Sequence, residues 1–161
     1  MRKVIIIGCP GSGKSTFART LQEKTGLPLY YLDQMYWRAD RTFVDKSLFR
    51  ERLQAALDRE EWIIDGNFAS TMELRLAACD TVFFLDYPLE VCLSGIEDRR
   101  GKPRPDMPWI EREPDEEFIS FIKNYRTDTR PMVMELLEKY PDKQVIVFHN
   151  RAEATAFLDN M

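Results

Sequence analysis

Two kinds of apolar pattern alternate along the chain. Short apolar runs bounded by polar residues predict buried strands at residues 3–7, 29–32, 62–64, 81–85 and 144–148. Between them, apolar residues recur at helical spacing, which predicts helices at residues 15–24, 45–59, 89–100 and 152–158. Another helix is expected from about Phe118 onward. If it continues to Tyr140, Pro131 should kink it.

Strands that alternate with helices predict an α/β protein, with a parallel sheet covered by helices on both faces. No linker or internal repeat divides the sequence, so residues 1–161 are expected to form a single domain. Residues 101–114 carry four prolines and mixed charges with no clear period. This composition predicts an inserted lid at about residues 99–118.

Composition narrows the class of protein further. Hydrophobic residues make up 44% of the chain and charged residues 31%, as in an ordinary soluble domain. The apolar runs are too short to span a bilayer or to serve as a signal peptide, so a cytoplasmic protein without membrane association is expected. The formal net charge of −4 argues against direct, non-specific DNA binding. Cys9, Cys79 and Cys92 lack metal-ligand spacing and are expected to be buried apolar residues.

The most specific motif is a phosphate-binding loop. Residues 8–15 read GCPGSGKS and fit GxxxxGK[ST] at every fixed position, after a predicted strand and before a predicted helix. Glycines let the backbone N–H groups converge on a phosphate, and the helix directs its positive end at the same anion. Lys14 is expected to reach the β- and γ-phosphates, and Ser15 to bind Mg²⁺. The predicted nucleotide-binding residues are Gly8, Pro10, Gly11, Ser12, Gly13, Lys14, Ser15 and Thr16. The nucleotide is expected to be ATP, although the sequence does not distinguish it from GTP.

Three carboxylates follow predicted strands. Asp33, Asp65 and Asp86 come after the second, third and fourth strands, and ligands of parallel sheets gather at the carboxyl ends of strands. We predict that Asp33 holds or deprotonates an acceptor hydroxyl and that Asp65 orders magnesium. The alternative for each is a helix N-cap or a turn, and for Asp86 that alternative is favoured.

Residues near these carboxylates are candidates for an acceptor site. Gly66 permits close backbone approach, and Asn67 offers both a donor and an acceptor. The aromatic residues after Asp33 either line a pocket for a flat or apolar acceptor or pack in the core. Arg75 either holds an acceptor anion or occupies an exposed helix position. The predicted acceptor-binding residues are Asp33, Tyr36, Trp37, Gly66, Asn67, Arg75 and Arg126.

A basic run lies at the base of the predicted lid. Arg99, Arg100, Lys102 and Arg104 form it, and Arg126 and Arg130 lie further along the chain. Arginines stabilise the charge that develops on a transferred phosphoryl group, which predicts catalytic roles for Arg99 and Arg130 beside Lys14, Asp33 and Asp65. The alternative is a solvated charged face.

The segments GCPGSGKST, YYLDQMYW, WIIDGNF and TVFFLDYP resemble the adenylate-kinase-like P-loop proteins, most closely the DNA topology modulation proteins. The resemblance covers nearly the whole chain. The phosphate-binding loop is common to many NTPases, whereas the LDQ-YW and IIDGN segments narrow the match. It implies a three-layer P-loop NTPase fold with a five-stranded parallel sheet of order 2-3-1-4-5, a lid between the fourth and fifth strands, and Mg-ATP as donor.

The same resemblance bears on the acceptor. Asp65 and Gly66 match the Asp-Gly that helps order magnesium and acceptor in nucleoside monophosphate kinases. Those kinases continue with Phe-Pro-Arg, whose arginine grips the acceptor phosphate. Here Asn67, Phe68 and Ala69 follow, so that arginine is absent.

Two functions are compatible with these residues. One is an ATP-dependent phosphotransferase acting on a small molecule or nucleotide, with the acceptor unidentified. The other is an ATP-dependent regulatory switch acting on a protein or DNA partner. A kinase needs an enclosed acceptor pocket near Asp33 and Asp65, whereas a switch needs a surface that changes with nucleotide.

Overall fold

A five-stranded parallel sheet forms the centre of the protein. The computed structural model describes residues 1–113 and 115–161. The strands are β1 (Lys3–Gly8), β2 (Leu29–Tyr31), β3 (Trp62–Asp65), β4 (Thr81–Leu85) and β5 (Gln144–Phe148). They lie in the order β2-β3-β1-β4-β5, and each neighbouring pair is parallel. The predicted order 2-3-1-4-5 is confirmed.

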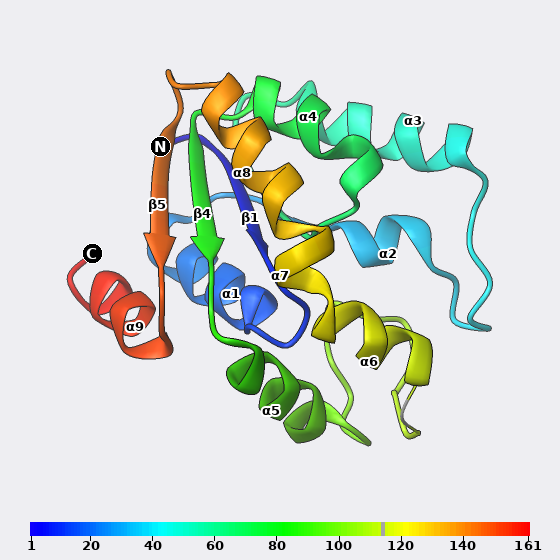
Figure 1. Cartoon of the computed structure of the whole chain (residues 1–161). Coiled ribbons are helices and arrows are strands. Elements are labelled where there is room, and N and C mark those ends of the chain that lie inside the picture. The colour runs from blue at the N-terminus through cyan, green and yellow to red at the C-terminus, as the bar shows by residue number, and fades with distance from the viewer. Residues whose placement is uncertain (114) are drawn as a thin grey trace.

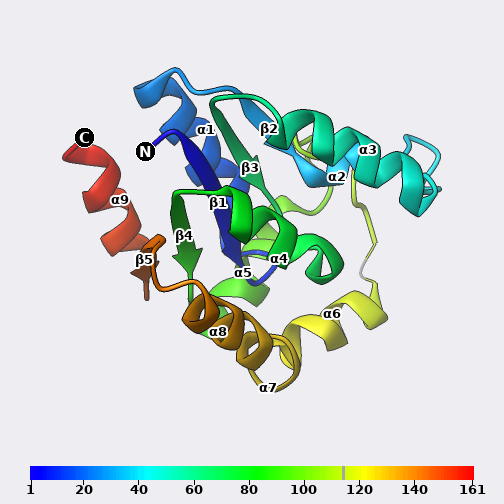
Figure 2. The ribbon, with the colours of Figure 1, turned by 90° about the horizontal axis from the view of Figure 1, so that it is seen from above.

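Alternating residues of β1 divide the core into two layers. Val4 and Ile6 pack on one face, together with α1 (Lys14–Thr25) and α9 (Arg151–Asp159). Ile5 and Ile7 pack on the other face. The helices there are α3 (Lys46–Leu57), α4 (Ala69–Ala78) and α8 (Arg130–Lys139). Figures 1 and 2 show these helices on the two sides of the sheet. The predicted arrangement of helices on both faces is therefore confirmed.

Because all the strands are parallel, their carboxyl ends meet at one edge of the sheet. In Figure 1 the arrows of β4 and β5 point toward this edge, where α5 (Leu89–Arg99) follows β4. The connection from β1 to α1 lies at the same edge and contains the phosphate-binding loop. The fold thus collects several loops where a ligand is expected.

Some elements differ from the prediction. A short helix, α2 (Leu32–Tyr36), begins where the second strand was expected to end, and α4 was not among the predicted elements, although one interpretation of Arg75 placed it on a helix. The expected long helix is three helices: α6 (Glu116–Lys123), α7 (Tyr125–Asp128) and α8. The breaks fall at Asn124 and Thr129. Pro131 stands in the first turn of α8, where its missing N–H is not needed.

The predicted lid, here called the lid segment (residues 99–118), joins α5 to α6. Residues 100–113 form turns and irregular backbone, and Pro114 lies outside the described residues. The lid segment contacts α2 and the turn after it. The Gln34 side chain donates to the Pro105 carbonyl, and the rings of Trp37 and Trp109 meet edge to face with centroids 5.3 Å apart. Within the described part of the chain, no helix has the length and apolar character needed to cross a membrane.

Candidate active site

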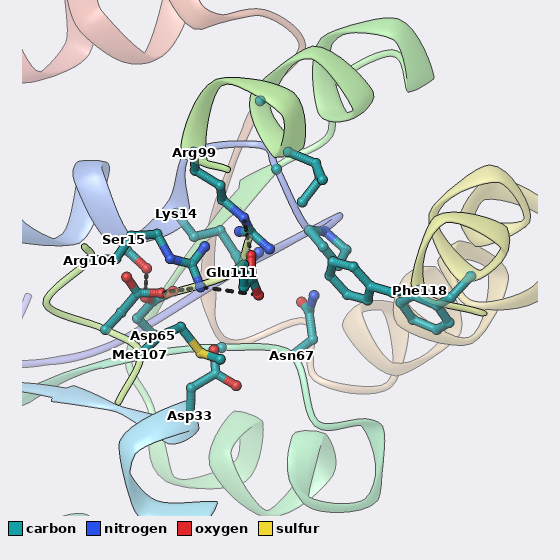
Figure 3. A pocket seen from close by; sticks show the side chains of 18 of the residues that line it. Lys14, Ser15, Asp33, Asp65, Asn67, Arg99, Arg104, Met107, Glu111 and Phe118 are labelled. Carbon is teal, nitrogen blue, oxygen red and sulfur yellow. Dashed lines mark hydrogen bonds and ion pairs between the residues drawn. The ribbon is translucent and has the colours of Figure 1, made fainter. Parts of the chain in front are cut away.

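A cavity of about 1200 Å³ lies at the carboxyl edge of the sheet. The phosphate-binding loop, α2, the β3–α4 connection, the lid segment and the end of α5 supply its walls. Figure 3 shows Lys14, Ser15, Asp33 and Asp65 around the same space, although they come from three different elements. The cavity therefore brings predicted phosphate-binding and acceptor-binding residues together.

The backbone of the phosphate-binding loop is curled as its motif predicts. Gly11 and Gly13 have φ angles of 84° and 94°, in the left-handed region that residues with a side chain rarely adopt. Gly13 is also the N-cap of α1, so the unpaired N–H groups of the first helical turn lie at the cavity. The Ser12 N–H donates to the Cys9 carbonyl at 3.1 Å. This geometry suits an anion held at the start of α1.

Lys14, Ser15 and Asp65 form the charged centre of the cavity. Lys14 Nζ donates to the Cys9 carbonyl at 3.3 Å, and burial lowers the pKa of Lys14 while the charge of Asp65 opposes that shift. The Ser15 hydroxyl donates to Asp65 Oδ2 at 2.6 Å. Burial raises the pKa of Asp65, and both Lys14 and Ser15 act against that rise. Asp65 Oδ1 is buried without a hydrogen-bond partner among the described residues, which leaves a hard oxygen donor beside the Ser15 hydroxyl.

Asp33 lies in the first turn of α2 and lines the cavity. Burial raises its pKa from the ordinary 3.8 to about 6, and the negative charges of Asp65 and Asp106 add to this shift. Lys14 and Arg104 oppose it. Asp106 comes from the lid segment and is itself buried. A carboxyl group with a pKa close to neutrality is suited to receive a proton from a hydroxyl.

The residues after Asp65 make contacts within the protein that the sequence did not predict. Asn67 uses both ends of its amide on Gly8: its Oδ1 accepts the Gly8 N–H at 3.2 Å, and its Nδ2 donates to the Gly8 carbonyl at 2.6 Å. Gly66 lies against α2, where an added Cβ would approach the Leu32 side chain to 2.9 Å. Both residues line the cavity, but the hydrogen bonds of Asn67 hold the phosphate-binding loop in place.

The prediction for Arg75 is wrong in both of its forms. Arg75 is completely buried in α4, so it is neither an exposed helix residue nor part of the cavity wall. Its guanidinium donates to the carbonyls of Gly66 at 2.9 Å and Phe68 at 3.2 Å, and also to the carbonyl of Asn67. Burial lowers its pKa to about 9, and the charge of Asp65 opposes that shift. Arg75 therefore organises the β3–α4 connection from within the core.

Arginines of the lid segment line the cavity as ion pairs. Arg99 Nε donates to Glu111 Oε2 at 3.2 Å, and burial lowers the pKa of Arg99. Arg104 Nη2 lies 3.7 Å from Glu111 Oε1 and 3.6 Å from Asp106 Oδ2. Figure 3 shows Arg99 and Arg104 on either side of Glu111. The predicted position of Arg99 at the cavity agrees with the structure.

Arg126 and Arg130 lie elsewhere. Arg130 binds the buried carboxylate of Asp86 through three hydrogen bonds: Nε donates to Oδ1 at 2.9 Å and to Oδ2 at 3.1 Å, and Nη2 donates to Oδ2 at 2.8 Å. Arg126 Nη1 is 3.6 Å from Asp86 Oδ1. Neither arginine lines the cavity, which disagrees with a catalytic role for Arg130 and an acceptor role for Arg126. Asp86 is not the N-cap of α5 either, because Pro88 occupies that position.

The two aromatic residues after Asp33, Tyr36 and Trp37, occupy different environments. Trp37 lines the cavity, whereas Tyr36 packs between Phe43, Phe49 and Phe68 at centroid distances of 5.1–5.5 Å. Among the phosphate-loop residues, Pro10, Gly11, Gly13, Lys14, Ser15 and Thr16 line the cavity, and Gly8 and Ser12 stand behind them.

Sequence reasoning missed several residues of the wall, namely Arg19, Gly95, Asp106, Trp109 and Arg151. Arg151 is the most distant of them, since it contacts the phosphate-binding loop from the start of α9. Its only sequence signal is its position just after the fifth strand of a parallel sheet.

No family model matches the chain. Two curated adenylate kinase sequences from Thermotoga neapolitana are similar to it, with 28% identity over 94 residues. That match covers 56% of this chain and 42% of the relative. The chain thus spans less than half the length of these relatives.

Among solved structures, shikimate kinase from Acinetobacter baumannii in complex with shikimate has a similar fold. The TM-score is 0.66 at 18% sequence identity, and the match covers 99% of this chain and 90% of the other. Together with the sheet order β2-β3-β1-β4-β5, this similarity defines the fold as that of the P-loop kinases.

The buried position of Arg75 leads to a prediction about stability. Replacing it by Met leaves the carbonyls of the β3–α4 connection without their donors, which should lower the free energy of unfolding by roughly 3 kcal/mol or more. Denaturant unfolding measures this change. Arg50→Met is the control, because exposed Arg50 makes one long hydrogen bond, to the Ser70 carbonyl, and should change stability by less than about 0.5 kcal/mol. Equal stability of wild type and Arg75→Met would contradict the assigned role.

The raised pKa of Asp33 leads to a second prediction. Between pH 3.8 and about 6 the folded protein holds a proton on Asp33 that the unfolded chain has released. The free energy of unfolding therefore falls as the pH rises through this range, and above it the ionised Asp33 destabilises the fold. Asp33→Asn should therefore raise the melting temperature at pH 7, and the gain should vanish as the pH falls below about 4. Carboxyl NMR titration of the free protein should show a group near pH 6 that Asp106→Asn shifts downward. If the Asp33 carboxyl itself titrates near pH 4 in both proteins, the proposed electrostatics are wrong.

Proposed function

We propose that this protein binds Mg-ATP and transfers its terminal phosphoryl group to a hydroxyl of a small molecule. The observation that carries this proposal is the placement of Asp33, a partly buried carboxyl with a raised pKa, in the same cavity as Lys14 and Ser15 of the phosphate-binding loop. The similarity of the chain to adenylate kinases and the P-loop kinase fold support the same reaction class.

The donor side rests on the phosphate-binding loop. Backbone N–H groups at the start of α1 and the Lys14 ammonium would hold the phosphates of the nucleotide. The Ser15 hydroxyl and Asp65 would hold Mg²⁺, whose charge neutralises the phosphates during transfer. The described residues contain no group of three or more metal-ligating His, Cys, Asp or Glu side chains, so phosphate and water oxygens would complete the coordination. An ATP donor also fits the predicted cytoplasmic location.

On the acceptor side, Asp33 would orient the hydroxyl and take its proton as the new phosphate ester bond forms. Arg99 and Arg104 line the same cavity, and they would stabilise the charge on the transferred group. Trp37, Phe68 and Trp109 add an aromatic wall, which suits a flat or apolar acceptor.

The β3–α4 connection disfavours a nucleoside monophosphate as acceptor. Asn67 is bound to Gly8, and Arg75, the next arginine along the chain, is fully buried and bound to backbone carbonyls. Neither is available to an acceptor phosphate. A regulatory switch related to DNA topology modulation remains a hypothesis from the sequence alone, whereas a cavity that holds Asp33 and Asp65 beside the phosphate-binding loop favours a kinase.

The proposal is tested by measuring ADP release from Mg-ATP across nucleosides, nucleotides, sugars and hydroxy acids, followed by two variants with the confirmed acceptor. Asp33→Asn should keep its affinity for ATP and lose about 10² to 10⁴ in transfer rate, because a general base contributes about that factor. Asp65→Asn should instead raise the magnesium concentration needed for half-maximal turnover. Exposed Asp142→Asn serves as the matched control and should behave like wild type. Normal transfer by Asp33→Asn would show that the proposed acceptor site is wrong.

A further inference from the structure

We propose that Arg151 is a positioning residue that fixes the peptide groups of the phosphate-binding loop in their phosphate-binding orientation. This inference rests on the nucleotide site proposed above and is independent of the acceptor. Arg151 is the first residue of α9 and lies 140 positions from Gly11 in the sequence. Its contacts with the loop are therefore tertiary.

Arg151 reaches two successive carbonyls of the loop. Its Nη2 donates to the Gly11 carbonyl at 3.2 Å and its Nη1 to the Ser12 carbonyl at 3.3 Å. The approach to Gly13 is equally close, because an added Cβ there would lie 2.9 Å from Arg151 Nη1. One planar guanidinium, in one orientation, thus binds the carbonyls of two successive peptide groups.

In a trans peptide the carbonyl and the following N–H point in opposite directions. Holding the Gly11 and Ser12 carbonyls toward Arg151 therefore turns the N–H groups of Ser12 and Gly13 away from it. The Ser12 N–H is already bound to the Cys9 carbonyl, so the Gly13 N–H is the donor left for a phosphate. A cation on the Ser12 carbonyl also polarises that peptide and strengthens its N–H as a donor.

Stabilisation of α9 does not account for an arginine at this position. A cation at the first residue of a helix is opposed by the helix dipole. The helix start is already capped, since the Asn150 side chain accepts the Glu153 N–H at 2.9 Å and the Glu153 carboxylate accepts the His149 N–H at 2.7 Å. The Arg151 guanidinium instead lies 5.8 Å from the centre of the Tyr87 ring, which holds it by a cation–π contact beside the loop.

The loop is also confined by α5. At Gly95 an added Cβ would lie 2.0 Å from the Gly11 carbonyl oxygen and 3.2 Å from Arg151 Nη2. The absence of a side chain at Gly95 therefore lets α5, the loop and Arg151 meet at one point. The Gly11 peptide lies between these two neighbours, and its only charged partner among the described residues is Arg151.

The test compares binding of Mg-ATP and of Mg-tripolyphosphate, which has no base or ribose, by isothermal titration calorimetry. Arg151→Ala should weaken both ligands by the same factor, about tenfold to a hundredfold, since hydrogen bonds from a charged donor are lost. Arg151→Lys keeps the charge without the planar fork and should recover only part of the affinity. Arg59→Ala is the control, because the Arg59 guanidinium also lies 5.8 Å from an aromatic ring, that of Tyr30, far from the loop.

Each other outcome is decisive. Unchanged binding of both ligands by Arg151→Ala would overturn the inference, as would a loss confined to Mg-ATP, which would mean that Arg151 contacts the base. If Arg151→Ala does not fold, Arg151→Lys decides, and wild-type affinity in that variant counts against positioning by the fork. A wild-type protein that binds neither ligand would refute the proposed nucleotide site, and this inference with it.

Discussion

A loop that turns its N–H groups inward to bind an anion must turn carbonyls outward, and these carbonyls need partners elsewhere. This requirement organises the carboxyl edge of the sheet. The Gly8 peptide is paired with Asn67 from the β3–α4 connection, and the Gly11 and Ser12 carbonyls are paired with Arg151 from α9. The phosphate-binding loop is thus held by elements from both halves of the chain, and its shape depends on the complete sheet.

The β3–α4 connection, on the other side of the cavity, depends indirectly on the same kind of interaction. Asn67 can reach Gly8 because Arg75 holds the carbonyls of the β3–α4 connection from within the core. The last residue of β3 before that connection is Asp65, which meets Ser15 at the start of α1. A buried cation in the core and a buried carboxylate in the cavity therefore stand at opposite sides of one short turn. Burial raises the pKa of Asp65 and lowers the pKa of Arg75, which favours the neutral form of each. The negative charge of Asp65 opposes the shift of Arg75.

Local patterns predicted much of the fold, because buried strands and amphipathic helices each have a characteristic spacing of apolar residues over a short stretch of sequence. The helix α4 was not predicted as an element because its buried face includes Thr71 and Arg75, which interrupt the apolar period. In the site, the motif of residues 8–15 and the carboxylates Asp33 and Asp65 were placed correctly at the sheet edge. The roles of Asn67, Arg75 and Arg130 were not predictable, because the hydrogen-bonding capacity of a side chain does not show whether its partner is a ligand, a backbone carbonyl or a buried acid. Arg151 depends on a contact across 140 positions, for which one sequence offers no signal.

The pairing of Arg130 with Asp86 has a consequence for how such a protein changes over evolutionary time. These residues are 44 positions apart, and the chain between them carries α5, the lid segment, α6 and α7. Their contact joins the two ends of this long connection next to β4, while Cys92 and Ile96 of α5 and Ile122 of α6 pack into the core beside the sheet. The entropy of closing a loop rises only slowly with length, by about 0.6 kcal/mol for each doubling. Insertions, deletions and exchanged residues within residues 100–113, between α5 and α6, can therefore reshape the outer wall of the cavity while the strand register and the phosphate-binding loop are inherited unchanged.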